Sequence, residues 1–236
     1  MMNRTTQGAG LTTLRRPDFV LPWLILSSLV MLYGYLVGTD RTSCPDACLL
    51  VNLGAAVSLL GLLVLPTDHR WQHPLFNSGV SVITFLLILV ILSKGSIPPS
   101  ILLQSGLSVF TISLLLQSAS TLLKSLSGRT IYGPLVVFLL TLLIGSTTLW
   151  LGPMAELLVL GDDTVNTIIA VSPLSYLSVA AQYDYLRSDW FYRNTPFGSL
   201  RFAYPELAIL STVYLSLSMA IQALNYRMNQ VKQTHH

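Results

Sequence analysis

Two histidines, His69 and His73, lie one helical turn apart and could together bind a metal ion if this stretch were helical. Their rings would then share one face of the helix. No third ligand is identifiable nearby, and Pro74 follows directly. We therefore expect loop histidines here and no metal site.

The only two cysteines, Cys44 and Cys48, enclose the short sequence CPDAC. Their spacing differs from the C-x-x-C pattern of redox enzymes. In an oxidising compartment outside the membrane the pair could form a structural disulfide. Two free thiols are the alternative, and the sequence alone leaves both open.

Other signatures of catalysis and nucleotide binding are missing from the sequence. No Walker-type Gly-Lys loop occurs, so the chain does not bind ATP in that manner. The hydrophobic runs hold no Ser-His-Asp set, no carboxylate cluster and no securely buried charge. A proton- or ion-coupled carrier usually needs such a charge at mid-membrane. We expect a protein that is not an enzyme, with no catalytic residue and no cofactor.

The composition indicates which solvent surrounds these residues. Of 236 residues, 52% are hydrophobic and only 10% are charged, whereas soluble domains carry about 25% charged residues. This charged fraction is too small for a protein whose surface faces water. Lipid must therefore cover most of the surface. We expect a single all-helical, polytopic membrane domain over residues 1–236, without the basic face that nucleic-acid binding requires.

Six hydrophobic runs approach the length of about 20 residues that a helix needs to cross the bilayer. Breakers such as Pro66, Pro74 and Pro153 separate the runs. A membrane barrel is excluded because its strands would alternate over about ten residues. The expected spans comprise residues 19–38, 49–65, 76–93, 100–123, 131–151 and 206–225.

A seventh span over Glu156–Val171 competes with this count. Asp162 and Asp163 lie near its middle, where each charge would cost about 2.5–3.5 kcal/mol on insertion scales. The stretch is also short. We therefore expect a re-entrant or interfacial element there, before the last span.

Lysines and arginines predict that both termini lie in the cytoplasm, as in a bacterial-type inner membrane protein. In that orientation the short outer loops hold only Arg41 and Lys94. Apart from those in the long segment 152–205, all remaining lysines and arginines lie on the inner side: Arg4, Arg15, Arg16, Arg70, Lys124, Arg129, Arg227 and Lys232.

The segment YDYLRSDWFYRNTPFGSLRFAYP, residues 183–205, gathers aromatic and charged residues just before the last run. Tyr and Trp favour the membrane–water interface, because the ring tolerates acyl chains while its polar atom stays wet. We expect an outer interfacial belt that anchors the chain; a lid or a surface for a partner is the alternative. Its candidate residues are Tyr183, Tyr185, Arg187, Trp190, Tyr192, Arg193 and Arg201.

A short helix is expected ahead of this belt. Ser172 is suited to the N-cap and Pro173 to the first helical position. Leu174, Leu177 and Ala181 fall near one face. This pattern predicts an amphipathic helix that lies in the interface with its polar side toward water.

Three segments resemble the membrane subunit of ABC transporters of the type-2 exporter class. TTLRRPDFVLPWLILSSLVMLYGY is similar to that family's N-terminal connector, and SLLLQSASTLLKSLSGRTIYGPLVVFLL to the hairpin of its fourth and fifth spans. VSPLSYLSVAAQYDYL stands where the family carries outer re-entrant helices. Those helices often open with Asn-Pro-Leu, and Ser172, Pro173 and Leu174 are the counterpart.

The resemblance implies an ATP-driven exporter. This chain would form the translocation path with a second permease copy or a related permease, and separate ATP-binding subunits would hydrolyse ATP. The loop PTDHRWQHPLFNSG departs from the family, since it lacks the acidic-basic run that leads to Gly-Thr. It is still compact and polar, and the implied ATPase-coupling residues are Asp68, His69, Arg70, Trp71 and His73.

A non-catalytic accessory subunit of a larger membrane complex is the alternative hypothesis. The outer aromatic belt would then dock neighbouring membrane proteins, and no ATPase would be needed. An enzyme acting on a lipid or a quinone is disfavoured by the missing catalytic groups. The lipid bilayer is a partner under every hypothesis.

Overall fold

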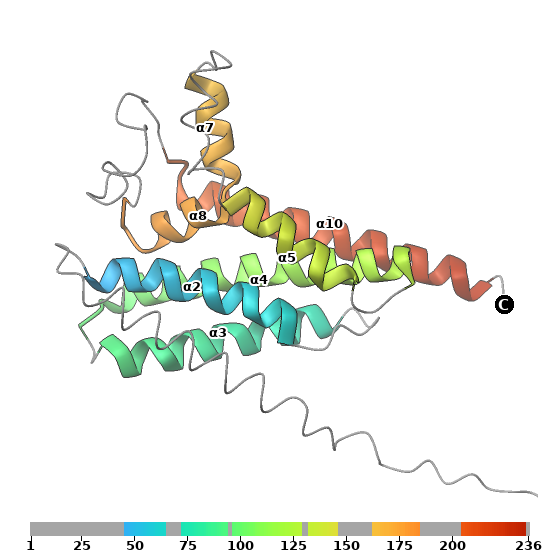
Figure 1. Ribbon diagram of the computed structural model, residues 1–236, viewed down its shortest axis with the longest axis horizontal. Coiled ribbons are helices and arrows are strands. Elements are labelled where there is room, and N and C mark those ends of the chain that lie inside the picture. The colour runs from blue at the N-terminus through green and yellow to red at the C-terminus, as the bar shows by residue number, and fades with distance from the viewer. Residues whose placement is uncertain are drawn as a thin grey trace, which may run out of the picture.

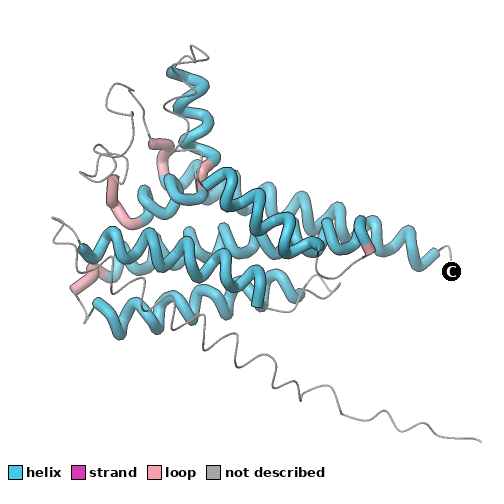
Figure 2. The backbone as a smooth tube through the Cα atoms, in the orientation of Figure 1, coloured by secondary structure: helices cyan, strands magenta, loops and turns pink. Residues whose placement is uncertain are grey.

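The structure is a computed structural model that describes residues 45–64, 72–93, 96–128, 132–145, 162–184 and 204–234. In these ranges the chain forms seven helices and no strand (Figure 2). The expected all-helical fold is therefore confirmed for the described residues. The helices are α2 (Pro45–Val64), α3 (Gln72–Ser93), α4 (Pro99–Ser127), α5 (Tyr132–Gly145), α7 (Asp162–Val171), α8 (Pro173–Ala180) and α10 (Leu207–Thr234).

Helix α4 is the centre of the bundle, because it contacts α2, α3, α5, α8 and α10. Figure 1 shows α2, α3, α4, α5 and α10 running side by side. The short α8 lies against this bundle near the end where α2 begins, and α7 projects away from it. The short helix expected after Ser172 is thus present as α8, and α7 lies within the element expected over 156–171, whose re-entrant or interfacial character stays a prediction.

Local chemistry explains where α4 begins and ends. Pro99 occupies the first turn, where a missing N–H costs nothing. At the other end Gly128 adopts φ 69°, and its N–H bonds the carbonyl of Lys124. Glycine takes this left-handed conformation without strain, and the Lys124 charge in the last turn complements the helix dipole.

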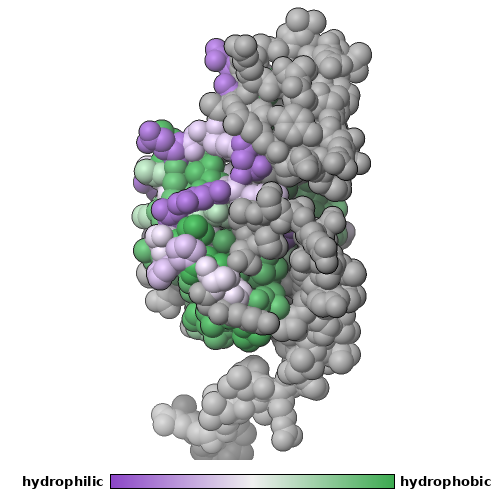
Figure 3. Space-filling model, turned by 90° about the vertical axis from the view of Figure 1, so that its left-hand side faces the viewer, coloured by the Kyte–Doolittle hydropathy of each residue, from purple (hydrophilic) through white to green (hydrophobic). Residues whose placement is uncertain are grey.

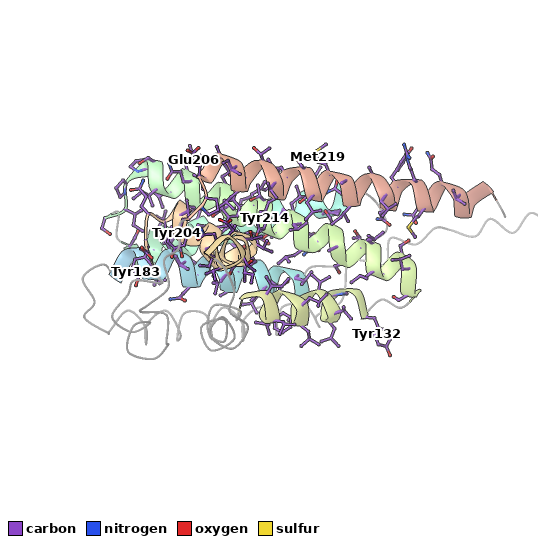
Figure 4. The ribbon with its side chains drawn as sticks, turned by 90° about the horizontal axis from the view of Figure 1, so that it is seen from above. Tyr132, Tyr183, Tyr204, Glu206, Tyr214 and Met219 are labelled. Atoms are coloured by element: carbon purple, nitrogen blue, oxygen red, sulfur yellow. The ribbon has the colours of Figure 1, made fainter. Side chains whose placement is uncertain are left out.

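The interior of the bundle is apolar and its outer faces are apolar too. Phe85, Leu89 and Val109 are completely buried in one core cluster, whereas Leu87 on α3 is 61% exposed and Met219 on α10 is 67% exposed. Figure 4 shows Met219 pointing away from the bundle. Exposed hydrophobic residues in such number match a lipid environment.

By length and composition, three helices in the described part of the chain can cross a membrane: Pro74–Ser93, Pro99–Ser127 and Leu207–Val231. They make this a membrane-embedded protein. Leu49–Leu63 and Tyr132–Gly145 are apolar helices of shorter length. The expected first span, 19–38, lies outside the described residues. The count of six spans therefore stays a prediction.

Helix α10 is longer than the expected span 206–225, since it continues to Thr234. Its 28 residues rise roughly 42 Å at about 1.5 Å each, more than the roughly 30 Å of a hydrocarbon core. Figure 1 shows its C-terminal end extending beyond α4 and α5. Arg227 therefore lies within helix α10, beyond the expected end of the span at residue 225.

Figure 3 looks onto the end of the bundle at which α2 begins. Hydrophilic residues cross the middle of this face, and hydrophobic residues gather below them. Polar groups thus reach this end of the molecule, where α8 also lies.

Candidate functional site

Tyr176 is the centre of a group of hydroxyls that joins three helices. Helix α8 places this side chain, completely buried, between α4 and α10. Its hydroxyl oxygen lies 3.0 Å from Thr111 Oγ1 of α4 and 2.7 Å from Ser211 Oγ of α10. We call these three residues the hydroxyl junction.

The direction of the hydrogen bonds in the hydroxyl junction follows from its outer members. Ser211 donates its only proton to the carbonyl of Leu207, at 2.8 Å. With that proton used, Tyr176 donates to Ser211. Tyr176 accepts from Thr111. The single Thr111 proton is shared with the carbonyls of Leu107 and Ser108, each at 3.1 Å. The three hydroxyls form one ordered chain that runs from α4 through α8 to the backbone of α10. The junction is neutral throughout.

A second tyrosine, Tyr214 of α10, holds the break between α7 and α8. Pro173 has no N–H to offer the preceding turn, and Ser172 is extended with φ −68° and ψ 125°. The hydroxyl of Tyr214 donates to the carbonyl of Val171, the last residue of α7, at 3.0 Å. The Tyr214 ring also contacts Tyr176, with centroids 4.9 Å apart.

The other end of α8 closes with a Schellman motif. The N–H of Tyr183 bonds the carbonyl of Ser178 at 2.9 Å, and the N–H of Gln182 bonds that of Val179 at 3.2 Å. Gln182 adopts φ 53°, which glycine would adopt with less strain. The C-terminal end of this short helix is therefore defined by two backbone bonds.

The amphipathic orientation expected for α8 is wrong. Its polar side does not face water, because Ser175 is completely buried and Ser178 is 1% exposed. The cause is a close approach to α2 that the sequence pattern does not reveal. A Cβ added to Gly54 would lie 2.9 Å from Leu177 Cδ2, so the glycine makes room for α8 inside the bundle.

Helices α4 and α10 are joined by a line of paired polar side chains, which we call the α4–α10 seam. Gln222 Nε2 donates to Ser118 Oγ at 3.0 Å. One heptad further along both helices, Ser125 Oγ lies 3.4 Å from Asn229 Oδ1. Hydrogen bonds of this kind hold helices together where lipid removes the usual hydrophobic drive for association.

Tyr183 is the one predicted belt residue within the described part of the chain. It is half-buried and packs against the core. Beside it, Tyr204 donates from its hydroxyl to Asp184 Oδ1 at 2.9 Å and joins the end of α8 to the start of α10. Figure 4 shows Tyr183, Tyr204 and Glu206 at the same end of the bundle, far from Tyr132. Outside the described residues lie Tyr185, Arg187, Trp190, Tyr192, Arg193 and Arg201.

The predicted coupling loop lies almost wholly outside the described residues. This holds for Asp68, His69, Arg70 and Trp71. Only the backbone of His73 is described, in the first turn of α3. The loop therefore stays a prediction.

The possible disulfide between Cys44 and Cys48 is also untested. Helix α2 begins at Pro45, earlier than the expected span, so the backbone of Cys48 is helical. Cys44 lies outside the described residues. Among the residues that are described, no three His, Cys, Asp or Glu side chains gather as a metal site would require.

Sequence analysis missed the hydroxyl junction. Serines and threonines are frequent in hydrophobic helices, and nothing local marks Thr111, Tyr176 and Ser211 as neighbours. A signal was present only for the α4–α10 seam, where polar residues recur every seven positions on both helices. The side chains described in these two places can donate and accept hydrogen bonds, and they carry no charge.

No protein-family model, no curated protein and no solved structure matches this chain. The function proposed next is therefore argued from residues and geometry.

Proposed function

We propose that this chain is the permease subunit of an ATP-driven exporter of the ABC type-2 class. It would form the translocation path with a second permease copy or a related permease, while separate ATP-binding subunits supply the energy. The observation that carries the proposal is the broken element α7–α8, whose short second helix is packed inside the bundle between the fifth and the last hydrophobic run.

A broken helix within a membrane bundle is costly unless protein or a cavity satisfies its backbone. Here Tyr214 bonds the freed carbonyl of Val171, and Tyr176 attaches α8 near the middle of α4 and one turn into α10. Transporters use discontinuous helices in this way to build sites at membrane depth. The break at Ser172 and Pro173 also lies at the segment that resembles the exporter family.

The chemistry of the described helices favours an external source of energy. α3, α5 and α8 contain no Asp, Glu, Lys or Arg, and α4 contains only Lys124, in its last turn. A proton-coupled carrier needs an ionisable group inside the membrane. The hydroxyl junction and the α4–α10 seam are neutral, which suits an uncharged or amphipathic substrate and a separate ATPase.

Co-purification tests the proposal. The full chain, tagged at its N-terminus, is isolated in mild detergent, and its partners are identified and assayed for ATPase activity. We expect a stoichiometric ATPase that is lost when residues 68–73 are replaced by Gly and Ser. A matched control, Gln182→Ala at the other end of the bundle, should retain it.

The opposite result is equally clear. If the tagged chain brings down other membrane subunits and no nucleotide-hydrolysing protein, the permease proposal is wrong. The chain would then be an accessory subunit, and the belt around Tyr183 would be its docking surface.

A further inference from the structure

A second line of buried polar residues lies on the side of α4 that faces α2. Ser113 and Gln117 of α4 are each 1% exposed, and Ser58 of α2 is 2% exposed. We call these three residues the α2–α4 seam. Unlike the α4–α10 seam, it contains side-chain atoms without hydrogen-bond partners among the described residues.

Two contacts fix how α2 and α4 are aligned at this seam. A Cβ on Gly54 would lie 3.2 Å from Val109 Cγ2, and Gln117 Nε2 donates to the carbonyl of Gly61 at 2.9 Å. From the first contact to the second, the residue number increases in both helices, from Gly54 to Gly61 in α2 and from Val109 to Gln117 in α4. The two helices are therefore parallel here. Ser58 lies one turn beyond Gly54, as Ser113 lies one turn beyond Val109. The two serines therefore occupy facing positions between the two contacts.

The hydroxyls of these serines are not turned onto their own helix. A helical serine can donate to the carbonyl four residues earlier, as Ser118 does at 2.6 Å and Ser218 at 2.7 Å. Ser58 Oγ and Ser113 Oγ make no such bond and no other within the described ranges. They are thus free to meet a ligand between the helices.

The amide of Gln117 faces the same space. Its nitrogen is held at α2 by the bond to Gly61, so its oxygen Oε1, on the same carbon, also lies at the α2–α4 interface. Oε1 is buried and has no described partner. Two hydroxyls and one amide oxygen at the α2–α4 interface therefore have hydrogen-bonding capacity that no described residue uses.

We infer that the α2–α4 seam binds water, with at least one ordered molecule bridging Ser58, Ser113 and Gln117. A buried water makes about two to four hydrogen bonds. The amide oxygen can only accept, whereas each hydroxyl can donate or accept, which matches a water that has two protons and two lone pairs. The three groups are neutral, whereas a calcium or magnesium ion would require more oxygen ligands, usually with carboxylates. This inference does not depend on the proposed function.

X-ray hydroxyl-radical footprinting in isotope-labelled water tests it on the full chain in lipid nanodiscs. Radicals form from bound water in place, so a sealed site is labelled without a reagent having to enter. We expect Val109, which is completely buried and lies one turn from Ser113, to take up label several-fold faster than the equally buried Leu89 of α3. Equal labelling of the two would overturn the inference.

Thermal unfolding of the double variant Ser58→Ala/Ser113→Ala gives an independent answer. In a dry seam the two hydroxyls are unpaired, and removing them should raise the melting temperature. In a hydrated seam the water loses two partners, and the melting temperature should fall; the labelling of Val109 should fall with it. Thr212→Ala, which removes an exposed hydroxyl bonded within its own helix, is the control. A rise in melting temperature for the double variant contradicts bound water.

Discussion

Tyr176 and Tyr214 lie ring against ring and form hydrogen bonds in opposite directions across the same interface. Tyr176 of α8 donates to Ser211 of α10, whereas Tyr214 of α10 donates to Val171 of α7. The break between α7 and α8 is thus held to α10 from both sides. Each hydroxyl can be removed while the other stays in place, so the two bonds can be tested separately.

Tyr214→Phe should destabilise the protein by about 1–2 kcal/mol, because the Val171 carbonyl loses its described partner. Tyr176→Phe should cost less, about 0.5–1 kcal/mol, since Ser211 keeps its bond to Leu207 and Thr111 can bond Leu107. Unfolding in mixed detergent micelles measures both. Tyr226→Phe, at an exposed site, should change little. A larger effect for Tyr176→Phe would contradict the assigned directions of the two hydrogen bonds.

The α4–α10 seam should show measurable coupling between its partners. A double-mutant cycle with Ser118→Ala and Gln222→Leu is expected to give about 0.6 kcal/mol, the average for such pairs in a membrane protein. The pair Ser125 and Asn229, at 3.4 Å, should couple more weakly. A coupling of zero at Ser118 and Gln222 would mean that the bond contributes nothing to helix association.

Gly133 of α5 permits the closest approach in the hairpin with α4. A Cβ at this position would collide with the backbone carbonyl of Ser120 and lie 3.1 Å from the nitrogen of Lys124. Gly133→Ala should therefore cost about 1–3 kcal/mol, because backbone atoms must shift. Gly79→Ala is the matched control, since nothing lies within 4 Å of its added Cβ. This control should be neutral or stabilising by up to about 1 kcal/mol.

Gln182→Gly should stabilise α8. Gln182 has φ 53° at the position of the Schellman motif that glycine prefers. Removing the Cβ from a residue in this left-handed backbone conformation relieves about 1 kcal/mol of strain. The melting temperature of the variant should rise. Gln182→Ala keeps the Cβ and should not raise it. Equal effects of the two substitutions would assign the gain to the lost side chain and not to the backbone.

Local chemistry made the short helices predictable. Ser172 followed by Pro173 defines a helix start wherever it occurs, because proline fits the first turn and interrupts what precedes it. This signal needs no knowledge of the rest of the fold. Helix α4, by contrast, continues to Ser127, beyond the expected span 100–123, and Gly128 caps it.

The burial of α8 could not be predicted, because it depends on contacts between distant segments. Leu177 fits against Gly54, and Tyr176 meets Thr111 and Ser211. An amphipathic pattern shows which face of a helix is polar, but it does not show which residues that face contacts. The length of α10 was underestimated for a different reason: the apolar run ends near residue 225, but Arg227 and Gln230 are good helix formers. Hydropathy detects contact with lipid and not the end of a helix.

The recurrence of the α4–α10 seam every seven residues has a mechanical consequence. A slip of α10 by one turn would bring Gln222 opposite Leu114 and Asn229 opposite Thr121, so both pairs would break together. The two pairs therefore favour one register of α10 against α4, and at about 0.6 kcal/mol for such a pair they bias this register without locking it.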